Sequence, residues 1–130
     1  MPHLQFEINK KVSDESKEIF VNEIRKTFSE VMDTGTEHIS ISLREYDKYN
    51  LTIGRADIND DICLMNLDIR EGRTIEKRRE LALKYMEIVK HNFGINTKNQ
   101  YITFTAHKGE DFHLVEKYLA TWISGEDPLV

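Results

Sequence analysis

The sequence predicts an α/β (α+β) fold in which a β-α-β unit is duplicated. A four-stranded mixed sheet carries two helices on one face, and a short C-terminal helix follows. Three observations predict this. Four short stretches alternate apolar and polar residues, and two longer stretches repeat apolar residues at helical spacing. Shifting the first half by 61 positions also puts Ile8 on Ile69, Ser13 on Thr74 and Ile41 on Ile102. Strand, helix cap and strand therefore recur in the same order.

The 130 residues form a single domain, which is an ordinary length for one. We expect a first β-α-β repeat at 2–44, a connection at 45–60, a second repeat at 61–106, and a C-terminal helix and tail at 107–130. Right-handed crossovers make the two strands within each repeat parallel.

The first repeat begins with a strand at 3–8, where Leu4, Phe6 and Ile8 share one face. Ser13 is a plausible helix N-cap with two acids after it. The helix that follows ends at Gly35. Its predicted buried positions are Phe20, Ile24, Thr27, Phe28, Val31 and Met32. A second strand covers 39–44.

The second repeat begins with a more deeply buried strand at 62–69. Thr74 can cap a helix that Gly94 follows. The predicted buried face of this helix is Ile75, Ala82, Tyr85, Met86, Val89 and Phe93. A fourth strand covers 101–106. In the tail, one face of a C-terminal helix would carry Phe112, Val115, Leu119 and Trp122.

Two helices cover only one face of a four-stranded sheet. The other face is then either solvated or packed against other subunits. Its predicted residues are Gln5, Glu7, Ser40, Ser42, Arg44, Asn66, Thr103 and Thr105.

Composition and charge exclude several classes of function. The net charge of −5 has the wrong sign for a protein that binds nucleic acid. We find neither a membrane-spanning apolar run nor a signal peptide, so we expect a cytoplasmic protein that does not act at a membrane. The five histidines and the single Cys63 lack metal-ligand spacing, and no cofactor fingerprint occurs. We therefore expect neither metal nor cofactor.

The Met-Pro start and the duplicated β-α-β unit resemble the tautomerase superfamily. Two stretches carry the resemblance best. Pro2-His3 before alternating apolar residues resembles the 5-carboxymethyl-2-hydroxymuconate isomerase group. The stretch 65–74, which contains Arg70-Glu71-Gly72-Arg73, resembles that group and the paired-arginine loop of the cis-3-chloroacrylic acid dehalogenase group. The resemblance implies a cofactor-independent homotrimer whose neighbouring chains share active sites.

Pro2 is the candidate catalytic residue. After removal of Met1 it would present a secondary amine, whose charged form is disfavoured by a desolvated pocket near cations. The neutral amine can take a proton from an enol oxygen or from the carbon beside a carbonyl.

Arginines are the candidate substrate ligands, because a planar guanidinium grips a carboxylate with two parallel hydrogen bonds. Antiparallel pairing of the first and third strands would place Pro2 near the Arg70–Arg73 loop. Arg44, on the uncovered face, either reaches a neighbour's pocket or pairs with Glu7 or Asp68.

The sequence thus predicts a keto-enol tautomerase or isomerase that acts on a small anionic substrate, an α-keto or enol carboxylate. Alternatives are a hydratase, dehalogenase or decarboxylase of the same superfamily, or a non-catalytic oligomeric binding module. Glu116 falls near the position of the dehalogenase's water-activating acid, but the register is off by about one residue, so we interpret it as a solvated helix acid.

Overall fold

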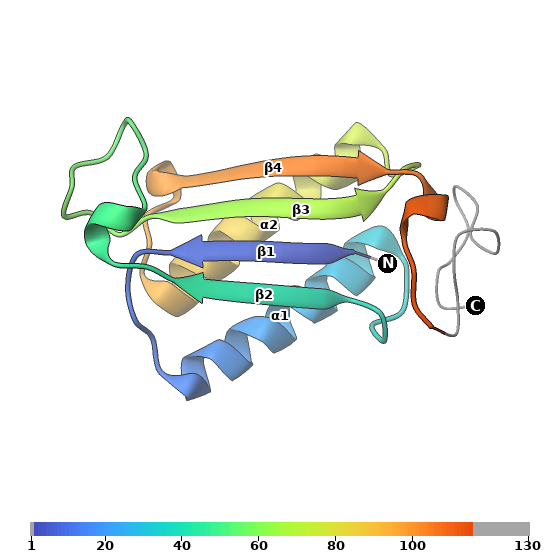
Figure 1. The fold of residues 1–130 in the computed structure, drawn as a ribbon, viewed down its shortest axis with the longest axis horizontal. Helices are drawn as coiled ribbons and strands as arrows, with labels where there is room; N and C mark the ends of the chain where they lie inside the picture. The colour runs from blue at the N-terminus through green and yellow to red at the C-terminus, as the bar shows by residue number, and fades with distance from the viewer. Residues whose placement is uncertain (1, 116–130) are drawn as a thin grey trace.

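The computed structural model describes residues 2–115. One mixed sheet and two helices form two layers, and both helices lie behind the same face of the sheet (Figure 1). The elements in chain order are β1 His3–Ile8, α1 Asp14–Met32, β2 Ser40–Glu45, β3 Cys63–Arg70, α2 Ile75–Phe93 and β4 Gln100–His107. Short 3-10 turns lie at Lys48–Asn50, Thr97–Asn99 and Gly109–Asp111. The predicted fold class, with four strands and two helices, is confirmed.

The sheet order is β2-β1-β3-β4. The strands of each repeat are parallel, and the antiparallel pair β1–β3 joins the two repeats at the centre. In that central pair His3 lies opposite Asp68, and Ile8 lies opposite Cys63. The starts of β1 and β2 therefore meet the ends of β3 and β4 at one edge of the molecule.

The two helices begin with matching caps. The hydroxyl of Ser13 accepts from the Ser16 N–H at 3.1 Å, and that of Thr74 accepts from the Lys77 N–H at 3.2 Å. The predicted end of the first helix at Gly35 is wrong. It ends at Met32, and Asp33 takes the left-handed conformation with φ 52°. A short Asp side chain tolerates that conformation, so glycine is not needed there.

The core lies between the sheet and the helices. Leu4, Phe6 and Ile8 are fully buried beneath α1 and α2. The rings of Phe6 and Phe20 meet edge to face at 5.0 Å. Seen from the helices, the buried positions are Phe20, Ile24, Phe28, Val31 and Met32 on α1, and Leu81, Tyr85, Val89 and Phe93 on α2.

The buried face of α2 differs from the predicted one at two positions. Ile75 is 41% exposed, whereas Leu81, which the prediction omitted, is fully buried. Leu81, Tyr85, Val89 and Phe93 follow each other at intervals of four, which is one stripe of a helix. Ile75 begins the helix and lies off that stripe, and Ala82 and Met86 are only partly buried.

The other face of the sheet is polar and is not covered by either helix (Figure 1). After β4 the chain makes the Gly109–Asp111 turn, and residues 112–115 are not helical. The rest of the predicted C-terminal helix, with Leu119 and Trp122, lies outside the described residues, as does Glu116. Within residues 2–115, neither helix is long and apolar enough to cross a membrane.

Candidate active site at the start of the first strand

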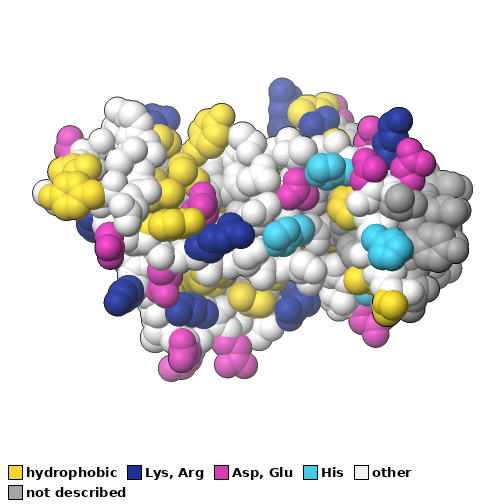
Figure 2. Space-filling model, in the orientation of Figure 1, with side chains coloured by type: hydrophobic (Ala, Val, Ile, Leu, Met, Phe, Trp, Pro, Cys, Tyr) yellow, Lys and Arg dark blue, Asp and Glu magenta, His cyan; other side chains and the backbone are white. Residues whose placement is uncertain are grey.

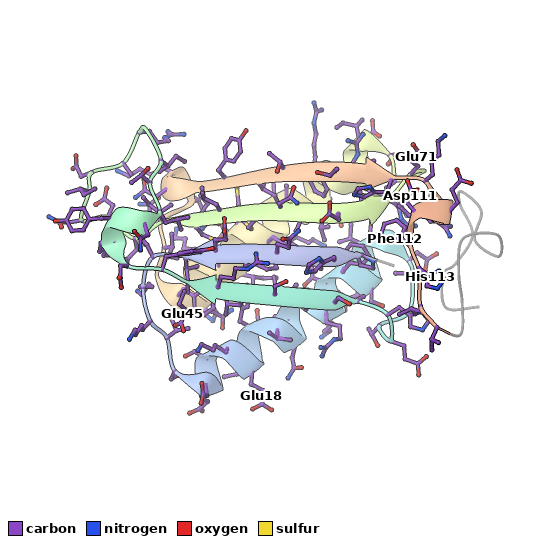
Figure 3. The ribbon with its side chains drawn as sticks, in the orientation of Figure 1. Glu18, Glu45, Glu71, Asp111, Phe112 and His113 are labelled. Atoms are coloured by element: carbon purple, nitrogen blue, oxygen red, sulfur yellow. The ribbon has the colours of Figure 1, made fainter. Side chains whose placement is uncertain are left out.

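A hollow of about 380 Å³ opens where β1 begins. The first residues of β1 and β2 contribute His3 and Ser40, Pro2 lies directly before β1, and the segment after β4 contributes Asp111–Leu114. Figure 1 shows this segment running across the ends of the strands beside the N-terminus. Asp111, Phe112 and His113 are labelled there in Figure 3. The hollow therefore joins the beginning of the chain to a segment more than 100 residues away.

Pro2 is buried at this edge of the sheet. Its carbonyl accepts from the Ser40 N–H at 3.1 Å, which extends the β1–β2 pairing by one step. A proline fits at a strand start, because its missing N–H interrupts no ladder bond there. The register of β1 and β3, continued by one residue, puts Pro2 opposite Ile69. Pro2 is thus held beside the end of β3, where Arg70 follows.

Arg70 is the last residue of β3 and only 2% exposed. It shares a register row with His107 of β4. After it, Gly72 takes a φ of 105°, which L side chains rarely adopt, and the chain turns into α2 within four residues. Arg70 is therefore a buried cation at the same edge as Pro2, and not an ordinary surface charge.

The other two predicted ligands lie elsewhere. Arg73 donates from Nη1 to the Met32 carbonyl at 3.1 Å, so it satisfies a carbonyl at the C-terminal end of α1. Arg44 is exposed on the open sheet face, and its Nη1 lies 3.4 Å from Oε1 of Gln5. Within the single chain, the side-chain partner of Arg44 is therefore Gln5, and not Glu7 or Asp68 as one of the two predictions had it. None of the three arginines is among the residues that line the hollow, but Arg70 lies at the end of β3 next to Pro2, whereas Arg73 and Arg44 point to other partners.

A polar network, which the sequence analysis did not identify, borders the hollow on the open face. Asp68 is its centre, with one carboxylate oxygen 2.8 Å from Nε2 of Gln5 and the other 2.9 Å from Nε2 of His107. His3 lies 2.5 Å from the Ser42 hydroxyl through its own Nε2. Figure 2 shows histidines gathered toward this end of the open face. The one signal in the sequence was that these residues alternate with buried ones on their strands.

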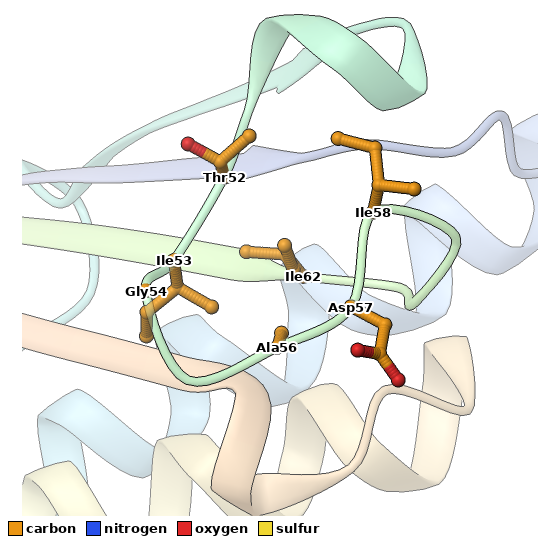
Figure 4. Close-up of a pocket in the computed structure, with 7 residues that line it drawn as sticks. All are labelled: Thr52, Ile53, Gly54, Ala56, Asp57, Ile58 and Ile62. Atoms are coloured by element: carbon orange, nitrogen blue, oxygen red, sulfur yellow. The ribbon is translucent and has the colours of Figure 1, made fainter.

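A second hollow, of about 260 Å³, lies in the connection between the repeats (Figure 4). Asp57 is the one ionisable side chain among the described residues that line it. The lining is Thr52, Ile53, Gly54, Ala56, Asp57, Ile58 and Ile62. Since reactive side chains do not converge there, the hollow at Pro2 is the better candidate for chemistry.

Other reactive groups are unsuited to catalysis. Burial raises the pKa of the Cys63 thiol to about 12, so it stays protonated in the core. Among residues 2–115, we find no cluster of three or more His, Cys, Asp or Glu side chains arranged to hold a metal ion.

Neither a family model nor a curated protein matches this sequence. Solved structures do match in fold. A symmetric trimer of the W0 fused 4-OT aligns with a TM-score of 0.82 at 14% identity, covering 92% of this chain and 99% of that one. Pt0534, inactivated by 2-oxo-3-pentynoate, aligns with a TM-score of 0.80 at 14% identity, covering 91% and 95%.

A macrophage migration inhibitory factor-like protein from Entamoeba histolytica aligns with a TM-score of 0.73 at 18% identity, covering 87% of this chain and 94% of that one. These similarities establish the architecture. The chain has the fold of these solved structures, which is the fold that the resemblance predicted.

Proposed function

We propose that this protein is a cofactor-independent tautomerase or isomerase of the tautomerase superfamily, acting on a small α-keto or enol carboxylate. The observation that carries the proposal is the buried Pro2 in the hollow at the edge of the sheet, with the buried Arg70 at the adjoining end of β3. The reaction requires a base and a carboxylate ligand close together, and Pro2 and Arg70 are the candidates at this end of the central strands.

In the proposed reaction the neutral amine of Pro2 takes the proton of the enol hydroxyl as the carbonyl forms. The resulting prolinium returns a proton to the carbon, so the net change is a proton shift from oxygen to carbon. The amine exists only where Pro2 is the first residue of the mature chain. Burial of that amine would disfavour its charged form, as a base that acts near neutral pH requires.

Arg70 is the proposed ligand of the substrate carboxylate, and its charge also stabilises the enolate. Arg73 and Arg44, which the sequence singled out as further ligands, have other partners in the single chain. A substrate role for either would depend on assembly. We propose a homotrimer, and its support is that fold neighbours such as the fused 4-OT proteins are described as symmetric trimers.

Covalent labelling tests the amine directly. 2-Oxo-3-pentynoate, the inactivator named for Pt0534, carries an alkyne conjugated to a ketone, to which a neutral amine adds. We expect one adduct per chain, located on the N-terminal peptide of protein lacking Met1. Pro2→Ala should also lower kcat/KM for ketonisation of phenylenolpyruvate by about 10²-fold or more.

Arginine variants test the carboxylate site. Arg70→Lys keeps the charge but loses the two-pronged geometry, so it should chiefly raise KM. Arg79→Ala, at an exposed position on α2, is the matched control and should change neither constant. An unaltered rate in Pro2→Ala would rule out Pro2 as the base. A mature chain that keeps Met1 would rule out this mechanism and favour a non-catalytic binding module. Release of carbon dioxide or halide instead would identify a decarboxylase or dehalogenase.

A further inference from the structure

The nonpolar wall of the Pro2 hollow is held in place by a histidine. Phe112 lines the hollow, and its ring meets the ring of His107 edge to face, with centroids 5.6 Å apart and planes at 88°. The turn between them is closed by two hydrogen bonds, Asp111 N–H to Lys108 C=O at 2.9 Å and Phe112 N–H to Gly109 C=O at 3.2 Å. The chain thus returns on itself and brings Phe112 back to the end of β4.

Two residues hold His107 in place: Asp68 of β3, and Glu71, which directly follows β3. Its Nε2 donates to Asp68 at 2.9 Å, because an ionised carboxylate only accepts. Its carbonyl accepts from the Glu71 N–H at 2.7 Å. The second oxygen of Asp68 is taken by Gln5, so the carboxylate has little freedom to turn. The His107 ring therefore has one orientation, set by three strands.

We propose that His107 is a positioning residue that holds Phe112 against the hollow, so that the pair sets which side chain the substrate carries. This rests on the proposed function. Pro2 and Phe112 line the same hollow, so a substrate that reacts at Pro2 lies within reach of this wall. A flat or branched nonpolar substituent packs on the fixed ring of Phe112, whereas a methyl group gains little from it.

Two variants of His107 each remove one of its two contacts, and the proposal expects both contacts to be needed. His107→Gln keeps a donor for Asp68 but removes the ring, and His107→Phe keeps the ring but removes the donor. Each should raise KM for phenylenolpyruvate by about three- to tenfold, the worth of an aromatic contact. Both should leave kcat within about twofold, because the reacting atoms are untouched. KM for the enol of pyruvate should hardly change.

A double-variant cycle tests whether His107 acts through Phe112. Phe112→Leu should raise KM for the aryl substrate, and adding His107→Gln to it should bring no further rise. Independent, additive effects would overturn the proposal. His91→Gln, at an exposed position on α2, is the matched control and should behave as the parent protein.

Hydrogen exchange gives a readout that needs no activity. The amides of residues 110–114 should exchange about tenfold faster in His107→Gln than in the parent, since loss of the ring contact frees the segment. Unchanged exchange in an active protein would overturn the positioning role alone. A parent protein that neither ketonises enols nor reacts with 2-oxo-3-pentynoate would remove the proposed function, and with it the substrate role of Phe112.

Discussion

Glu45, at the end of β2, ties the sheet to the beginning of α1 with one carboxylate. It accepts from the Val12 N–H at 2.7 Å and forms an ion pair with Lys17 at 2.9 Å. The hydrogen bond from Lys17, followed by that from Val12, holds the pKa of Glu45 below its ordinary 4.5. Figure 3 labels Glu45 beside the start of α1 together with Glu18, which is exposed.

Glu45→Gln should lower the urea midpoint at pH 7, because the charge that Lys17 meets is gone. A carboxyl whose pKa is lowered by folding stabilises the protein above its unfolded pKa, and loses that effect as pH falls through the folded pKa. The difference between parent and variant should therefore be full above about pH 4.5 and vanish on further acidification. Glu18→Gln serves as the control. A pH-independent difference would contradict this account.

The two helices are joined by a hydrogen bond as well as by packing. The hydroxyl of Tyr85 on α2 donates to the carbonyl of Ile24 on α1 at 3.0 Å, in the interior. Its ring also lies 5.8 Å from that of Phe6 on the sheet. Burial raises the pKa of this hydroxyl well above its usual value, so Tyr85 remains a neutral donor.

Tyr85→Phe should reduce the free energy of unfolding by about 1 kcal/mol, the net worth of a buried hydrogen bond. Tyr85→Ala should cost about 3–5 kcal/mol, since it also leaves a cavity among three elements. Urea unfolding measures both. The control is Tyr49→Phe at a position that is 75% exposed, where the change should stay within about 0.5 kcal/mol. Equal effects at the two tyrosines would show that the hydrogen bond adds nothing.

For the whole molecule, the open face of the sheet is the surface that we expect the proposed trimer to cover, because neither helix packs on it. Figure 2 shows white, uncharged polar side chains or backbone over much of its middle, with charged and histidine side chains among them. Thr103 and Thr105 both donate to the amide oxygen of Asn66, at 3.1 and 3.2 Å. Because these hydroxyl and amide groups bond to one another, the face is stable when exposed to water. Their short side chains would also allow another chain to approach closely.

Thr103→Arg should convert the proposed trimer to smaller species, because it puts a large charged side chain on the open face that the trimer would have to bury. Light scattering should give about three times the 15.3 kDa chain mass for the parent and a lower multiple for the variant. Circular dichroism should be unchanged. Leu83→Arg, at a position 66% exposed on α2, is the control and should remain trimeric. A monomeric parent, or an intact Thr103→Arg trimer, would contradict the proposed assembly.

The sequence by itself determined the elements and their order. Alternation at Leu4, Phe6 and Ile8 sets the strand period, and Ser13 and Thr74 provide the helix caps, because these signals act within one turn or one strand. The duplication predicted the parallel pair within each repeat. The antiparallel pairing of β1 and β3 was only assumed, and the structure shows that it brings Pro2 beside the end of β3. The end of α1 at Met32, with Asp33 as its C-cap, differs from the predicted end at Gly35, because glycine is the stronger local signal.

Only the tertiary structure decided which side chains far apart in the sequence meet in and around the site. The bonds of Asp68 to His107 and Gln5 join residues 39 and 63 positions apart, and Arg73 reaches Met32 across 41. Such contacts depend on strand register and on the return of the chain after β4, which brings Phe112 to Pro2. A hydrophobic period reports which face of an element is buried, because burial is a local average. It does not encode which distant side chain lies opposite, because that follows from the packing of the whole sheet.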